Sequence, residues 1–244
     1  MKIQLISDTH GYCPDFNISS EADLIIHAGD ISDGYDLYEK TEEFDRLCKQ
    51  ANKDYLFVLG NHDWYHIDIN NSPNVYDETK LLSRHKPITI NGITFAGCTL
   101  WSGLYGVENP NYFAPFVRYL NDFNYIKDAT SKDTFFSLER MVEEHKKDLE
   151  YIEQYRNKDN VVLITHFPLS QDFLDAKYVG NPLNPYFLND IDTSGYDIII
   201  AGHTHHTMRK TLDNGSQLFL NAYGYSNSFQ KECPSFDTNY SITV

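Results

Sequence analysis

Residues 24–30 read Leu-Ile-Ile-His-Ala-Gly-Asp, a short apolar run that ends in a glycine and an acidic residue. Other stretches have the same form, an apolar run followed at once by polar residues, and they are 3–10, 55–63, 161–166 and 197–205. Such Ile-, Leu- and Val-rich runs are typical of strands that are buried on both faces. Because the carboxyl ends of these strands collect ligands in an α/β sheet, we expect the polar residues to meet in one site.

The polar residues are those that divalent cations bind. The clusters are Asp8-Thr9-His10, Gly29-Asp30, Gly60-Asn61-His62-Asp63, Thr165-His166 and Gly202-His203-Thr204-His205. Carboxylate, imidazole and amide ligands suit a pair of divalent metal ions, and loops beyond strand ends expose them. His203 and His205 alternate along the chain, whereas the histidines of a helical metal motif are spaced by a turn. These two are therefore expected in a loop or at a strand end.

The remaining patterns predict helices and antiparallel hairpins. Residues 35–51 and 137–155 have helical spacing of apolar residues among charged ones. The turns Asn91-Gly92 and Asp213-Asn214-Gly215 each separate two strand-like runs, which indicates hairpins. Residues 240–244 can add an edge strand. The fold class is therefore α/β, with mixed sheets covered by helices.

The length of 244 residues fits one α/β domain over residues 1–244. The segment at about 102–158 differs from the rest and is interpreted as a cap or helical insertion. The apolar run before Asp8 is too short for a secretory signal or a membrane span, so we expect a cytoplasmic protein without membrane contact. The oligomeric state is left open.

The chain is acidic, with 20 basic and 35 acidic residues and a formal charge of −15. This charge opposes capture of nucleic-acid backbone or anionic lipid, so nucleic acid is an unfavourable partner, although a confined basic groove would escape notice. The four cysteines, Cys13, Cys48, Cys98 and Cys233, lack the close pairing of zinc or redox motifs. We expect reduced, structural thiols.

Taken together, the five clusters resemble the calcineurin-like metallophosphoesterase superfamily. Its pattern is Asp-x-His, Gly-Asp, Gly-Asn-His-Asp/Glu, a lone His and Gly-His-x-His, and all five occur here in order between Asp8 and His205. The segments 97–101 and 221–225 are similar to a bacterial and phage-type branch. The resemblance implies a four-layer α/β/β/α sandwich, with two mixed β-sheets flanked by helices.

The resemblance also implies the ligands of two metal ions. Asp8, His10, Asp30 and His205 would hold one ion, Asp30, Asn61, His166 and His203 would hold the other, and Asp30 would bridge them. A carboxylate has two oxygens and can span a dinuclear separation of about 3.5–4 Å. Taken alone, Asp30 reads as a turn former or helix cap and His166 as a structural histidine. The complete set favours metal binding.

For catalysis, the resemblance implies that His62 donates a proton to the leaving group and that the neighbouring Asp63 orients it. The alternative for His62 is a loop histidine bonded to nearby backbone. Asp33 is interpreted as a turn former with Gly34, or else as a residue that orients a ligand. Trp101, Tyr105, Tyr112 and Phe113 form either a wall over the cleft or part of the core.

The predicted function is hydrolysis of a phosphate mono- or diester in a small phosphorylated substrate, by a hydroxide that bridges two divalent metals. Ligation by oxygen and nitrogen favours Mn²⁺, Fe²⁺ or Zn²⁺, and family resemblance suggests Mn²⁺ for assays. Two alternatives are a nuclease acting on DNA or RNA and a catalytically silent binding scaffold of the same fold. A nuclease would call for a basic track, and a scaffold would be expected to have lost ligands that this chain retains.

Overall fold

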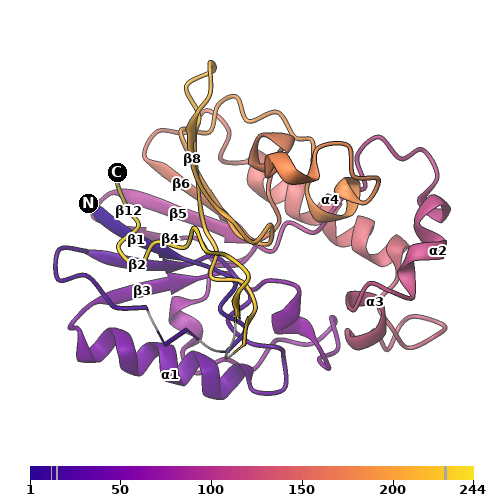
Figure 1. Ribbon diagram of the computed structural model, residues 1–244, viewed down its shortest axis with the longest axis horizontal. Helices are drawn as coiled ribbons and strands as arrows, with labels where there is room; N and C mark the ends of the chain where they lie inside the picture. Colours follow the sequence, from indigo (N-terminus) through magenta and orange to yellow (C-terminus); the bar gives the residue numbers. More distant parts are fainter. Residues whose placement is uncertain (12, 15, 228–229) are drawn as a thin grey trace.

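Two mixed β-sheets form the centre of the computed structural model, which describes residues 1–11, 13–14, 16–227 and 230–244 (Figure 1). The first sheet has the strand order β12-β1-β2-β3. Its strands are β1 (Lys2–Ile6), β2 (Leu24–His27), β3 (Asp54–Phe57) and β12 (Ser241–Thr243). The first three are parallel, and β12 pairs antiparallel with β1, so the predicted edge strand is confirmed.

The second sheet has the order β4-β5-β6-β7-β9-β8. Its strands are β4 (Ile88–Ile90), β5 (Ile93–Cys98), β6 (Val161–Thr165), β7 (Ile198–Ala201), β8 (Thr207–Thr211) and β9 (Gln217–Asn221). Both predicted hairpins are confirmed, as β4–β5 and β8–β9. At the first turn Asn91 and Gly92 have φ of 51° and 80°, the left-handed values that a tight hairpin turn requires.

The two sheets face each other across an apolar layer. Leu5, Ile26 and Leu56 of the first sheet belong to the same buried cluster as Phe95 and Ile164 of the second. The other face of the first sheet packs on helix α1 (Leu37–Gln50), and the other face of the second packs on α4 (Leu138–Glu153). Figure 1 shows α1 and α4 on opposite sides of the sheets. The α/β/β/α order predicted from the sequence is confirmed.

Short elements lie between the main strands and helices. They are the helices α2 (Ala114–Val117), α3 (Asp122–Tyr125) and α5 (Asn184–Phe187), the 3-10 turns His62–Trp64, Glu78–Lys80, Pro110–Phe113, Gln171–Phe173 and Ala176–Tyr178, and the paired strands β10 (Ser226–Asn227) and β11 (Gln230–Lys231). Trp101 and Phe113 are buried in an aromatic cluster with Phe123 and Phe136, which supports the core alternative for these two rings. Tyr112 is 57% exposed.

The segment 102–158 has two parts that lie in different places in the fold. Its α4 portion packs on the second sheet through Tyr151 and Ile152, while α2 and α3 lie at the right of Figure 1, apart from both sheets. The assignment of the whole segment as a cap or insertion stays a prediction. Within the described residues, no helix combines the length and the apolar character needed to cross a membrane.

The apolar layer between the sheets should be sensitive to single methyl groups. Ile164→Val removes one methylene from a side chain that is 0% exposed, so it should lower the free energy of unfolding by about 1 kcal/mol. Ile90→Val makes the same chemical change in the partly buried β4 and should cost clearly less. Urea titrations of the two variants measure both values. Equal losses would contradict this description of the core.

Candidate metal centre

The carboxyl ends of strands from both sheets meet at one place. Asp8 follows β1 and Asp30 follows β2, while His166 follows β6 and His203 follows β7. The backbone N–H of His203 donates to the Asp8 carboxylate at 2.9 Å, and the N–H of Gly202 donates to the carbonyl of His166 at 3.0 Å. Residues 195 positions apart are thus in direct contact. The polar clusters meet in the structure, as the sequence predicted.

Left-handed backbone conformations turn the predicted ligands toward one another. Positive φ angles occur at Asp8 (55°), His10 (46°), Asp30 (55°), His203 (69°) and His205 (42°). A side chain on Cβ makes this region unfavourable, so such residues cluster where tertiary contacts impose the conformation, often at functional sites. Five of the left-handed non-glycine residues thus lie in the strand-end loops that carry the predicted ligands.

Two glycines of the motifs, Gly29 and Gly60, allow neighbouring side chains to lie very close to the backbone. A Cβ atom on Gly60 would lie 2.1 Å from Oδ1 of Asp30, and a Cβ atom on Gly29 would lie 2.4 Å from Nδ1 of His166. Both distances are far inside van der Waals contact. The glycines therefore let the loops after β2 and β3 pack against the predicted ligands.

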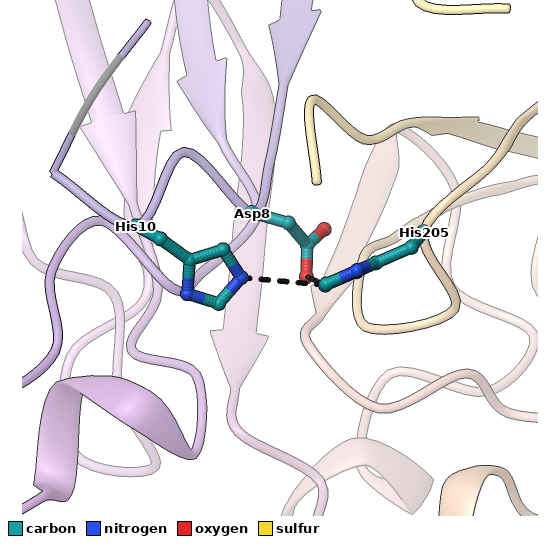
Figure 2. A group of neighbouring side chains, drawn as sticks. All are labelled: Asp8, His10 and His205. Atoms are coloured by element: carbon teal, nitrogen blue, oxygen red, sulfur yellow. Dashed lines mark hydrogen bonds and ion pairs between the residues drawn. The ribbon is translucent and has the colours of Figure 1, made fainter. Parts of the chain in front are cut away.

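One group of donors consists of Asp8, His10 and His205, whose side chains point toward one another in Figure 2. Nε2 of His205 lies 3.4 Å from Oδ1 of Asp8 and 3.3 Å from Nε2 of His10. The ring of His205 is held from its other side, where Nδ1 contacts Glu232 at 2.6 Å. This group could hold one metal ion.

A second group consists of Asp30, His166 and His203, all of them buried. Nε2 of His166 lies 3.2 Å from Oδ2 of Asp30 and 3.1 Å from Oδ1 of Asn61. Asn61 is itself fixed, because its amide donates to Asp122 at 2.8 Å. Ligand atoms of Asp30 also approach those of His10 and His62 in a third grouping. Asp30 therefore lies between the two groups, as a bridging carboxylate would.

The donor atoms fit a cation better than they fit each other. In its neutral form, His166 can donate from Nδ1 to the carbonyl oxygen of Ala28, 2.9 Å away, and Nε2 then turns its lone pair toward the oxygens of Asp30 and Asn61. Nε2 of His203 is buried and has no hydrogen-bond partner among the residues that the structure describes. Buried polar atoms are rarely left unpaired. A metal ion among the donors would give Nε2 of both His166 and His203 a partner.

The pKa values of these residues follow the same pattern. Burial would lower the pKa of His166, but the charge of Asp30 outweighs it and raises that pKa to about 9. Burial would also lower the pKa of His205, but the hydrogen bonds with Asp8 and Glu232 outweigh burial and raise that pKa to about 10. Burial and the neighbouring His166 hold the pKa of His203 well below its ordinary value, so its ring is neutral. The carboxylates thus stabilise positive charge at both groups.

His62 is held by Asp33 and not by Asp63. Nδ1 of His62 lies 2.8 Å from Oδ1 of Asp33, and the same oxygen lies 3.2 Å from Nδ1 of His10. The carboxylate of Asp63 instead accepts the backbone N–H groups of Asp30, Gly60 and Ser32, at 2.9, 2.9 and 2.8 Å. The prediction that Asp63 orients His62 is therefore wrong, because both of its oxygens are committed to the backbone.

Burial opposes a higher pKa for His62, but the charge of Asp30 and the hydrogen bond with Asp33 outweigh it, so the pKa is raised. A protonated His62 donates from Nδ1 to Asp33 and from Nε2 to the hydroxyl oxygen of Tyr225, which is 2.9 Å away. The Tyr225 ring also stacks on His10, with 4.3 Å between the centroids. Burial also raises the pKa of Asp63, as does the neighbouring charge of Asp30.

The sequence gave no role to Tyr225, Asp122 or Glu232, and it left Asp33 as either a turn former or a residue that orients a ligand. Asp33 and Tyr225 contact His62, Glu232 contacts His205, and Asp122 contacts Asn61. Asp33 had a signal, because it lies only three positions after Asp30 in the same loop. Asp122 and Glu232 follow no strand with a recognisable cluster, so only the three-dimensional contacts reveal them.

The position of Asp30 between the two donor groups gives a direct test. Asp30→Asn keeps the size of the side chain but removes the charge, so Mn²⁺ binding should weaken at both groups. Isothermal titration of the metal-free protein with Mn²⁺ measures the stoichiometry and the affinities. Asp133→Asn makes the same change at an exposed residue and should bind Mn²⁺ like the unmodified chain. Loss at only one group would contradict a shared role for Asp30.

Comparisons with known proteins identify the family of the chain and proteins with a similar fold. The model of the calcineurin-like phosphoesterase family matches residues 1–207. Phosphopantetheinyl hydrolase from Mycobacterium tuberculosis has a similar structure, with a TM-score of 0.67 and 16% sequence identity over 92% of this chain and 89% of that chain. A dimetal phosphatase from Danio rerio gives a TM-score of 0.43 and 14% identity, over 90% and 86% of the respective chains. No curated protein shows significant sequence similarity. The chain belongs to the calcineurin-like phosphoesterase family, whose members are metal-dependent hydrolases of phosphate esters.

Proposed function

We propose that this chain hydrolyses a phosphate mono- or diester with the help of two divalent metal ions. The observation that carries the proposal is the position of Asp30 between two groups of donors. Asp8, His10 and His205 would hold one ion together with Asp30, and Asn61, His166 and His203 would hold the other together with Asp30. The donors are oxygen and nitrogen atoms without thiolate, a set that suits Mn²⁺, Fe²⁺ or Zn²⁺.

Two such ions, when bound, would supply a bridging hydroxide near neutral pH and positive charge for the phosphoryl oxygens. The protein side chains would then control geometry and protons. Asp33 fixes the ring of His62 through Nδ1, which leaves the Nε2 proton directed at the hydroxyl oxygen of Tyr225. A leaving alcohol whose oxygen replaces the Tyr225 hydroxyl as the acceptor of this hydrogen bond would receive the proton from His62. Asp63 contributes by holding the loops after β2 and β3.

Hydrolysis of nucleic acid is the second candidate and is less well supported. The chain has a formal charge of −15, and no lysine or arginine belongs to the described lining of the pocket beside the donors. A binding scaffold without activity is also disfavoured, because every predicted ligand and His62 are retained and brought together. The small-molecule phosphoesterase therefore remains the proposal.

A panel of substrates tests the reaction. With Mn²⁺ added, p-nitrophenyl phosphate, bis-p-nitrophenyl phosphate, cyclic nucleotides and single-stranded DNA are compared, and at least one of the small esters should be hydrolysed. Removal of metal by a chelator, followed by restoration with Mn²⁺, Fe²⁺ or Zn²⁺, should abolish and recover that activity. Hydrolysis of DNA alone would replace the proposal by the nuclease alternative. No turnover with any metal would overturn it.

The proton-donating role of His62 predicts a dependence on the leaving group. His62→Gln should lower kcat by a factor of about 10²–10⁴ with a poor leaving group such as phenol, and much less with p-nitrophenol, which departs without a proton. Mn²⁺ affinity should be retained, because His62 is not among the proposed ligands. His85→Gln, at an exposed histidine outside the donor groups, is the matched control. Equal losses with both leaving groups would contradict the assignment.

A further inference from the structure

A pocket of about 410 Å³ opens directly onto the donor groups. Its floor includes Asp30, His62 and His203, so a phosphate held at the donors would place the rest of its molecule in this pocket. The volume lies within the range of small-molecule sites. The lining beyond the floor therefore carries information about the organic part of the substrate. This step rests on the function proposed above.

Aromatic rings from separate segments form much of the wall. Tyr119 follows α2, Tyr178 belongs to the 3-10 turn Ala176–Tyr178, and Phe187 belongs to α5. Tyr119 is 70% exposed and Tyr178 is 41% exposed, although both are large rings that gain free energy from burial. A planar group bound in the pocket against either ring would cover part of this exposed surface. Stacking on an aromatic side chain is worth about 1–3 kcal/mol for each ring of a ligand.

Apart from the histidines at the donor groups, the polar part of the wall is neutral or acidic. Asn121, Asn181 and Asn184 supply amide donors and acceptors without charge, whereas Asp122 and Glu232 are carboxyl groups. No lysine or arginine belongs to the lining within the described part of the chain. Two basic side chains lie on the tyrosines without joining that lining. Arg118 lies 4.6 Å from the ring of Tyr119, and Lys177 lies 4.8 Å from the ring of Tyr178 and pairs with Asp175.

This distribution of charge limits the substrate. With metal ions bound, one phosphate would find positive charge at the donor groups, but a second phosphate in the pocket would find no lysine or arginine in the described lining and would lie beside the carboxylate of Glu232, since Asp122 is buried and bonded to Asn61, Tyr65 and Tyr186. An uncharged ring would instead contact tyrosines and amides. We infer that the substrate is an ester with a single phosphate, whose organic group is uncharged and carries a planar ring. Nucleoside polyphosphates and acidic phosphopeptides are thereby excluded.

Matched ester series test this inference, in whichever ester class the panel above identifies. For diesters, dimethyl phosphate, thymidine 5′-(methyl phosphate) and its 3′-phosphorylated form share methanol as the leaving group, and the first of them carries no ring. For monoesters, the series is ethyl phosphate, thymidine 5′-phosphate and thymidine 3′,5′-bisphosphate. We expect kcat/KM to rise about tenfold or more from the alkyl ester to the thymidine ester, which corresponds to about 1.4 kcal/mol. The additional 3′-phosphate should reverse most of that gain.

Variants locate the effect in the pocket. Tyr119→Ala and Tyr178→Ala should each lower the ratio of kcat/KM between the thymidine and alkyl esters by a factor of about five or more, in line with the loss of one stacking contact. Tyr112→Ala, at another exposed tyrosine that is not part of the lining, should keep the ratio of the unmodified chain. Circular dichroism of each variant establishes that it is folded before kinetics are compared.

The outcomes separate this inference from the proposed function. Absence of turnover with every ester overturns the phosphoesterase proposal, and the inference with it. Turnover of alkyl and thymidine esters with equal kcat/KM overturns the inference alone, as does faster turnover of the 3′-phosphorylated ester. A thymidine preference that survives both tyrosine substitutions also overturns it, because the preference would then arise elsewhere.

Discussion

The carboxylate of Asp63 fixes the part of the structure on which the site depends. It accepts backbone N–H groups from Asp30 and Ser32, after β2, and from Gly60, after β3. A buried acceptor with three donors is costly to replace, since each donor would lose its partner in a place that water does not reach. Through these bonds one side chain sets the left-handed turn at Asp30 and the position of Asn61 and His62. The geometry of the candidate metal centre therefore depends on Asp63, a residue whose carboxylate accepts hydrogen bonds from backbone N–H groups.

Much of the architecture was predictable because local patterns agree with the global fold. The Ile- and Leu-rich runs before Asp8, Asp30 and His166 are strands, and the Asn91-Gly92 turn has the backbone that a hairpin requires. The division of these strands between two sheets follows from which apolar faces meet, and the family resemblance anticipated it. The sequence analysis predicted no helix at α5, which begins at Asn184. One helical turn is too short to leave a periodic pattern.

The side chains that meet at the site were predictable from the sequence, whereas the residues that contact and hold them were less so. Asp8, His10 and His205 form recognisable clusters at strand ends, whereas Asp33, Asp122 and Glu232 act through contacts that depend on loop direction. Asp63 is adjacent to His62 in sequence, yet the 3-10 turn that begins at His62 points its carboxylate into the backbone of a neighbouring loop. Adjacency along the chain gave the wrong partner because side-chain direction is a property of the folded backbone.

Each donor group takes side chains from both sheets. Asp8 and His10 come from the half of the molecule built on β1, and His205 from the half built on β7, while Asp30 and His166 are divided in the same way. An ion shared between the halves would act as a cross-link at their common border, and its binding energy would oppose any separation of one sheet from the other. The same metal-binding equilibrium would then determine both the catalytic activity and the resistance of the two sheets to separation.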